Sequence, residues 1–186
     1  MTTPSEATKP SERREVGRSA LILPVPEAEP LVAEWRARWD PNASLGIPAH
    51  ITLLFPFLPQ DRITSAEVTR LRDLFSQIPE ADISLTHTAR FDGVLYLAPE
   101  PDGFFRDITM RLWAMYPDTP PYGGLYDDMK PHLTVVQSVD EVVLRQAESA
   151  LSEGLPVAVR PREAWLLLEA TDGRWHQHTR MPFRDD

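Results

Sequence analysis

The 186-residue chain is 42% hydrophobic and 25% charged, a composition typical of one soluble globular domain or of two small lobes built as one. It has no cysteine, which excludes disulfides and thiolate chemistry, and no apolar run approaches membrane-spanning length, so we expect a cytoplasmic protein without a membrane partner. Because binding of long nucleic acid needs a basic surface, the formal net charge of −9 favours a small nucleotide or an RNA end as partner.

The first half of the chain predicts alternating strands and helices. Residues 1–17 are polar and lack the apolar core of a secretory signal, so we expect a disordered tail before a single folded domain over residues 18–186. Apolar periodicity and turn residues then predict, in chain order, a buried strand (19–25), a helix (26–40), a loop (41–48), a strand (49–57), a helix (64–78) and a hairpin of two strands (83–91 and 94–97) closed by Asp92-Gly93.

The second half repeats this order of elements. It predicts a helix (102–116), a loop (117–128), a strand (131–137), a helix (140–151) and three strands (156–160, 164–168 and 175–181). A duplicated order of this kind predicts an α+β fold with pseudo-twofold symmetry, in which two antiparallel sheets flanked by helices form two lobes around a central cleft.

One tetrapeptide pattern, His–hydrophobic–Thr–hydrophobic, occurs twice, at residues 50–53 and 132–135. Each copy lies in a predicted strand and closely follows a proline. Because side chains alternate between the two faces of a strand, each His and Thr projects from one face while the apolar residues enter the core. A single match would carry little weight, but two matched copies in one chain are improbable by chance.

These four residues suit acid–base chemistry on a phosphate. Histidine is the side chain whose unperturbed pKa allows one copy to be neutral and another charged near pH 7, so we expect one of His50 and His132 to act as base and the other as acid, in an order the sequence leaves open, with a bell-shaped pH profile around neutrality. Thr52 and Thr134 can donate hydrogen bonds to the non-bridging oxygens. The alternative interpretation is a pair of structural histidines beside threonines that merely favour strands.

The motifs resemble those of the 2H phosphoesterase superfamily, which includes bacterial 2′-5′ RNA ligase-like proteins and cyclic phosphodiesterases. That family is defined by two His-x-Thr/Ser motifs, matched here at 50–52 and 132–134, and the resemblance covers roughly residues 18–183. It implies a bilobal fold that cleaves 2′,3′-cyclic phosphates or 2′-5′ linkages without a metal or another cofactor. Some members carry an arginine shortly after the second motif, whereas this chain continues Val-Val-Gln-Ser at 135–138.

Five further residues are candidates for substrate binding. Arg90 and Lys130 could bind phosphate, since Lys130 flanks the second motif and Arg90 ends a strand beside the Asp-Gly turn. Tyr122 and Tyr126 precede the second motif and could stack on a base, although an ordinary surface loop explains them equally well. Phe55 follows the first motif, and either cleft binding or core packing fits it.

Three functions remain open at this level. The first is a metal-independent phosphoesterase, the second is RNA ligation as the reverse of the same chemistry, and the third is a catalytically idle nucleotide-binding module. Because both histidines are intact, the sequence favours the active enzyme.

Overall fold

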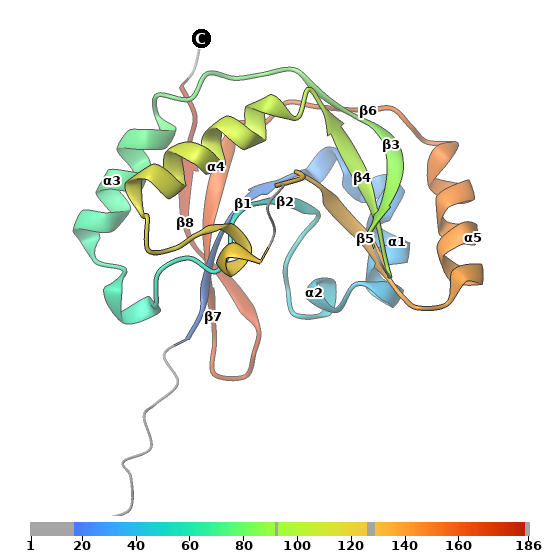
Figure 1. The fold of residues 1–186 in the computed structure, drawn as a ribbon, viewed down its shortest axis with the longest axis horizontal. Helices are drawn as coiled ribbons and strands as arrows, with labels where there is room; N and C mark the ends of the chain where they lie inside the picture. Colours follow the sequence, from blue (N-terminus) through green and yellow to red (C-terminus); the bar gives the residue numbers. More distant parts are fainter. Residues whose placement is uncertain (1–16, 92, 126–128, 185–186) are drawn as a thin grey trace, which may run out of the picture.

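Two four-stranded antiparallel sheets form the two lobes of the molecule (Figure 1). The structure is a computed structural model and describes residues 17–91, 93–125 and 129–184. The first sheet has the order β2-β1-β7-β8, with β1 at Ser19–Pro24, β2 at His50–Leu54, β7 at Glu163–Glu169 and β8 at Trp175–Pro182. The second has the order β5-β4-β3-β6, with β3 at Ile83–Phe91, β4 at Val94–Glu100, β5 at Leu133–Gln137 and β6 at Val157–Val159.

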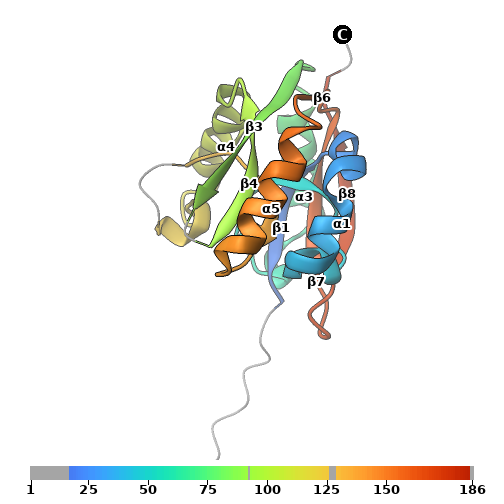
Figure 2. The same cartoon turned by 90° about the vertical axis from the view of Figure 1, so that its right-hand side faces the viewer.

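The helices are exchanged between the two sheets. The longer ones are α1 (Glu29–Trp39), α3 (Ser65–Phe75), α4 (Gly103–Met115) and α5 (Glu141–Ser152). Helix α1 links β1 to β2 yet contacts β5 of the second sheet, and α4 links β4 to β5 yet contacts β2 of the first. Helix α3 covers the first sheet, whereas α5 lies beside α1 over the second (Figures 1 and 2). The predicted bilobal α+β fold with two antiparallel sheets is therefore confirmed, but each lobe draws on both halves of the chain.

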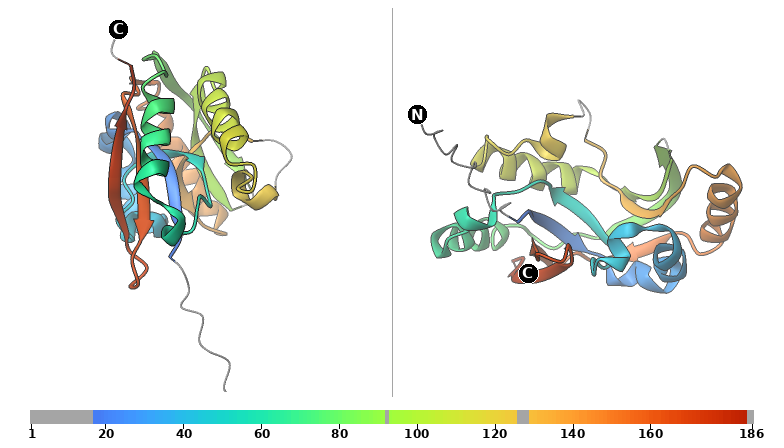
Figure 3. Two further views of the ribbon diagram at one scale, coloured as in Figure 1. Left: turned by 90° about the vertical axis from the view of Figure 1, so that its left-hand side faces the viewer. Right: turned by 90° about the horizontal axis from the view of Figure 1, so that it is seen from below.

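The two motif strands, β2 and β5, contact each other where the sheets meet (Figure 3). Within them the predicted alternation holds, because Ile51, Leu53, Leu133 and Val135 are at most 1% exposed and belong to the main apolar core. The His and Thr positions between them are only half-buried. The core thus fixes the register of both strands and leaves the polar residues on the opposite face.

Local sequence signals account for most element ends. Thr64 caps α3 by accepting a hydrogen bond from the Glu67 N–H at 3.3 Å, and Asp140 caps α5 through the Val142 N–H at 2.8 Å. The predicted hairpin is present, with Phe91 opposite Val94 in the register of β3 and β4.

Several boundaries differ from the prediction. A short helix, α2 (Pro41–Ser44), occupies part of the predicted loop, because Asp40 caps it and its proline lies at the first turn. Strand β2 ends at Leu54 rather than residue 57, since Pro56 has no N–H for the ladder. Strand β4 runs on to Glu100, where it still pairs with β3.

The remaining elements are three short 3₁₀ helices, η1 (Pro26–Ala28), η2 (Gln60–Arg62) and η3 (Pro121–Gly124). The predicted tail lies almost wholly outside the described residues, so the expectation of disorder there stays a prediction. None of the helices that the structure describes is both long enough and apolar enough to cross a membrane.

Candidate active site

His50 opens strand β2, and its ring is held by one hydrogen bond. Its Nδ1 lies 2.8 Å from the carbonyl oxygen of Pro48, two residues earlier. A carbonyl oxygen only accepts hydrogen bonds, so Nδ1 must carry the proton and donate it. The other ring nitrogen, Nε2, is then the atom available for chemistry.

His132 repeats this arrangement on the second lobe. It directly precedes β5, and its Nδ1 lies 2.7 Å from the carbonyl oxygen of Lys130, again two residues earlier. By the same argument Nδ1 donates and Nε2 remains free. In both motifs the imidazole therefore has the same tautomer, and in both it is fixed by a hydrogen bond to the carbonyl two residues earlier.

Thr52 and Thr134 lie on the same strand faces as the histidines, one pleat further along. Thr52 is opposite Ile22 of β1, and Thr134 is opposite Tyr96 of β4. Both threonines are half-buried, and neither hydroxyl forms a hydrogen bond with another described residue. Two O–H donors are thus available to a ligand beside the two Nε2 atoms. We refer to the two histidines and two threonines as the two-histidine site.

Burial lowers the pKa of both imidazoles. The pKa of His50 falls to about 4, mainly through desolvation, with further lowering from the positive charges of Arg36 and His132; the Pro48 hydrogen bond and Asp40 oppose this. The pKa of His132 is also lowered by desolvation, against its bond to Lys130. The effect of His132 on the pKa of His50 indicates that the His50 ring lies within range of the charge on His132. Both shifts favour the neutral form of the imidazole.

Aromatic rings surround His132. Phe91 meets its ring edge-on with centroids 5.0 Å apart, Tyr96 lies at 5.3 Å, and Tyr122 is nearly parallel to it at 6.3 Å. Phe91 and Tyr96 also stack on each other at 4.5 Å, and Phe91 is 38% exposed. Phe91 and Tyr96 were not among the residues predicted from the sequence. The alternation of side chains on either side of the Asp-Gly turn could have placed both rings on one face of the sheet. That face is known to meet His132 only once β5 is known to pair with β4.

The residues predicted to bind substrate near the motifs do not all lie at the two-histidine site. Tyr122 lies at the site, and its backbone N–H donates to the Phe55 carbonyl at 2.7 Å, which ties η3 to the end of β2. The Phe55 ring contacts Trp175 in a small apolar cluster on the first sheet, so packing is its evident role. The Lys130 side chain is exposed, while its carbonyl holds His132. Tyr126 lies outside the described residues.

Arg90 is a correction to the sequence analysis. It precedes Phe91 on β3 and therefore points to the opposite face of the sheet, away from His132. There its guanidinium forms ion pairs with Glu141, at 2.6 Å, and with Glu148, both on α5. The arginine stabilises the contact between β3 and α5, and we exclude it from the two-histidine site.

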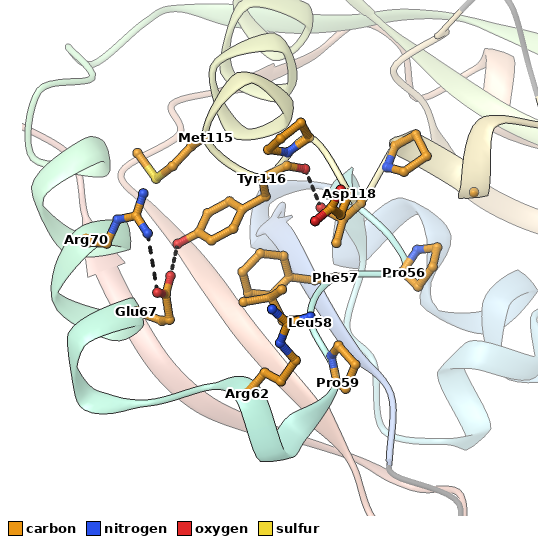
Figure 4. Close-up of a pocket in the computed structure, with 14 residues that line it drawn as sticks. Pro56, Phe57, Leu58, Pro59, Arg62, Glu67, Arg70, Met115, Tyr116 and Asp118 are labelled. Carbon is orange, nitrogen blue, oxygen red and sulfur yellow. Dashed lines mark hydrogen bonds and ion pairs between the residues drawn. The ribbon is translucent and has the colours of Figure 1, made fainter.

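A cavity of about 660 Å³ lies beside α3 and the C-terminal end of α4, and neither histidine lines it (Figure 4). In its wall the Tyr116 hydroxyl donates to Glu67 at 2.7 Å, and Arg70 pairs with the same carboxylate at 3.3 Å. These three side chains satisfy one another, so we treat the cavity as separate from the two-histidine site. Nowhere in the described ranges do three or more His, Asp or Glu side chains gather as metal ligands.

A two-lobed α+β fold with paired His-x-Thr strands defines a class of protein, and comparisons with known proteins agree. The sequence model of the 2′-5′ RNA ligase superfamily matches residues 24–173. The chain therefore belongs to this superfamily of 2H phosphoesterases. It is also similar to a Bacillus licheniformis protein that carries the name of a phosphoesterase, with 26% identity over 125 residues, 65% of this chain and 70% of that protein.

Solved structures share the fold at low sequence identity. E. coli LigT in complex with 3′-AMP superposes with a TM-score of 0.59 and 18% identity, covering 92% of this chain and 100% of LigT. A Thermus thermophilus protein gives a TM-score of 0.62 with 17% identity, covering 91% of this chain and 99% of that one. LigT has also been crystallised with NADP+ and with ATP.

Proposed function

We propose that the protein is a phosphoesterase that opens 2′,3′-cyclic phosphates or cleaves 2′-5′ phosphodiester linkages by metal-independent acid–base catalysis. The observation that carries this proposal is the matched pair of bonds from Nδ1 of His50 and His132 to backbone carbonyls. Both bonds leave Nε2 free, and two nitrogens of this kind beside two hydroxyls can supply the base, the acid and the phosphate hydrogen bonds for metal-free hydrolysis of a phosphodiester. Membership of the 2H phosphoesterases supports the same reaction class.

In the proposed reaction a water molecule attacks phosphorus. Nε2 of neutral His50 takes the proton of the water as the new P–O bond forms, and Nε2–H of protonated His132 gives its proton to the ribose oxygen as the old P–O bond breaks. Thr52 and Thr134 donate hydrogen bonds to the non-bridging oxygens, where negative charge increases in the transition state. Protons and bonds balance, and the products are a phosphomonoester and a free hydroxyl.

The assignment of the two roles follows from their surroundings. Of the two histidines His50 has the pKa lowered to about 4, so it is neutral over almost the whole physiological range and suits the base. His132 is beside exposed aromatic surface, and a bound phosphate anion would raise its pKa and favour the protonated form. We therefore assign His132 as the acid.

The substrate we propose is a small nucleotide or the end of an RNA. The rings of Phe91 and Tyr122 beside His132 offer faces on which a base can stack, and the exposed Lys130 supplies a cation nearby. The complexes of E. coli LigT with 3′-AMP, NADP+ and ATP support a ligand of this size. The acidic overall charge supports it as well, because a long nucleic acid would be repelled.

The test is turnover of a substrate panel. We expect the protein to hydrolyse 2′,3′-cyclic mononucleotides or 2′-5′ dinucleotides in the presence of EDTA, with product followed by chromatography. His50→Ala and His132→Ala should each lose about a thousandfold in kcat, because each removes one proton-transfer group. Loss of activity in EDTA would contradict the metal-free mechanism, and full activity in either variant would contradict the site.

RNA ligation is the second candidate, favoured by the symmetry of the two histidines. Running the reaction backwards exchanges acid and base, and both imidazoles are held in the tautomer that permits either role. Joining of a 2′,3′-cyclic end to a 5′-hydroxyl end at high RNA concentration would reveal it. Nucleotide binding without turnover of any phosphodiester would instead favour an idle binding module.

A further inference from the structure

Three charged side chains of α1 and its C-terminal cap lie directly behind the first motif. Arg36 is 3% exposed, and the Asp40 side chain is fully buried beside it. The guanidinium donates to Asp40 Oδ2 from Nη2 at 2.8 Å and from Nε at 3.0 Å. Glu29, 38% exposed at the other end of the helix, lies 3.9 Å from Arg36 Nη1. We call these residues the α1 charge network. Because a buried ion pair is a weak source of stability by itself, its placement needs a reason.

The network holds the backbone on both sides of Pro48. Arg36 Nη2 donates to the carbonyl of Ile47 at 3.1 Å, and the Glu29 carboxylate accepts the N–H of Ala49 at 2.7 Å. The Pro48 carbonyl lies between these two anchors, and its oxygen accepts the hydrogen bond from Nδ1–H of His50. The chain is thus fixed one residue before and one residue after the atom that orients the imidazole.

We propose that Glu29, Arg36 and Asp40 form a positioning network that fixes the tautomer and the aim of His50. None of the three needs to touch the substrate, since each acts on the ring through the backbone of residues 47–49. The contribution to catalysis rests on the function proposed above. The effect on the imidazole itself does not, so it can be measured without any substrate.

The charges around His50 fit this role. The charged groups that act on it are Arg36 and Asp40 from behind and His132 from the neighbouring strand, with Glu29 beside Arg36. The two carboxylates and the single guanidinium have a formal sum of −1, and Arg36 and Asp40 act in opposite directions on the pKa of His50.

The second lobe has no matching anchor among the described residues. Lys130, whose carbonyl holds His132, has an exposed side chain, and no described carboxylate or guanidinium bonds to the backbone at residues 129–131. The network does reach that lobe at one point, where Gln137 at the end of β5 donates to Asp40 at 3.4 Å. The difference predicts that loss of the network affects His50 and leaves His132 unchanged.

The experiment compares three variants of the full chain. Glu29→Ala removes the acceptor for Ala49, whereas Glu29→Gln keeps an oxygen in its place, and Glu34→Ala alters an exposed acid on the same helix as a matched control. Because Glu29 is partly exposed, we expect all three to fold, which thermal unfolding checks. The readouts are ¹⁵N NMR of the imidazoles near pH 7, which reports the tautomer of each ring, and kcat and KM on a substrate that the wild type hydrolyses.

In Glu29→Ala we expect the Nδ1–H tautomer of His50 to lose population, His132 to stay unchanged, and kcat to fall about tenfold at constant KM. Glu29→Gln and Glu34→Ala should resemble the wild type. An unchanged His50 signal in Glu29→Ala, or no rescue in Glu29→Gln, overturns the proposal. If the wild type hydrolyses nothing, the proposed function fails while the tautomer comparison still decides the positioning role.

Discussion

The two histidines form the same hydrogen bond, from Nδ1 to a backbone carbonyl two residues earlier, but the residues that surround the two rings differ. Behind His50 lies the α1 charge network, in which Arg36 and Glu29 anchor the backbone on either side of its carbonyl partner. Around His132 lie three aromatic rings, one of them exposed to solvent. The first environment is buried and charged, and the second is aromatic and partly exposed to solvent.

This difference bears on the proposed reaction, in which one histidine is the base and the other the acid although the fold is nearly symmetric. Duplication supplies two imidazoles in the same tautomer, which alone would leave acid and base equivalent. In the proposed mechanism, surroundings that differ separate their proton affinities, and the aromatic side supplies a surface for the base of a nucleotide. The predictions below test the two environments separately.

The largest expected effect is on stability, from the buried pair behind His50. Arg36→Met leaves the Asp40 carboxylate buried without its cation, so the free energy of unfolding should fall by about 3–5 kcal/mol in urea titrations at pH 7. Arg36→Met combined with Asp40→Leu should recover most of this loss. As the control on the other lobe, Arg90→Met should change stability much less, because Glu141 and Glu148 remain exposed to water. Equal losses of unfolding free energy in Arg36→Met and Arg90→Met would contradict the difference between the buried and the exposed ion pairs.

Removal of the threonine hydroxyls comes next. Thr52→Val and Thr134→Val keep the shape of the side chain, so the strands should fold, but each variant loses one donor to the phosphate. We expect kcat to fall about a hundredfold in each, with a smaller effect on KM, in steady-state assays. A change below twofold in both variants would remove the threonines from the mechanism.

Acidification tests the burial of His50. Its pKa is about 4 in the folded protein and near 6.5 when unfolded, so below pH 6.5 the unfolded chain takes up the proton first. The stability due to neutral His50 is therefore complete above pH 6.5 and is lost as the pH falls toward 4. Between pH 7.5 and 4.5 the wild type should lose roughly 2 kcal/mol more than His50→Gln in urea unfolding. Parallel losses would mean that His50 is not desolvated.

The smallest effect concerns the aromatic side of the comparison. Phe91→Ala should raise KM for a 2′,3′-cyclic mononucleotide about tenfold with little change in kcat, since stacking on a base contributes about 1–3 kcal/mol. KM for a ribose 2′,3′-cyclic phosphate without a base should not change. Arg90→Met, the adjacent residue on the opposite face, should alter neither constant. An equal rise for both substrates would argue against stacking at Phe91.

Much of the site was predictable because its signals are local. The period of two in the motif strands places His50 and Thr52 on one face, and the same holds for the second copy. Caps such as Thr64 and the Asp-Gly turn after Phe91 also act within a few residues. The prediction for Arg90 was wrong because the relevant signal is not local. The direction of the Arg90 side chain depends on which face of β3 packs against α5.

The sequence by itself determined the order of elements, the two His-x-Thr strands and the resemblance to the 2H phosphoesterases. Only the tertiary structure decided that α1 and α4 cross to the opposite lobes, that Phe91 and Tyr96 gather at His132, and that Arg36 and Asp40 lie behind His50. Periodicity and capping are set by neighbours along the chain, whereas these contacts join residues from different elements. They form only when the two sheets bury their apolar faces against exchanged helices.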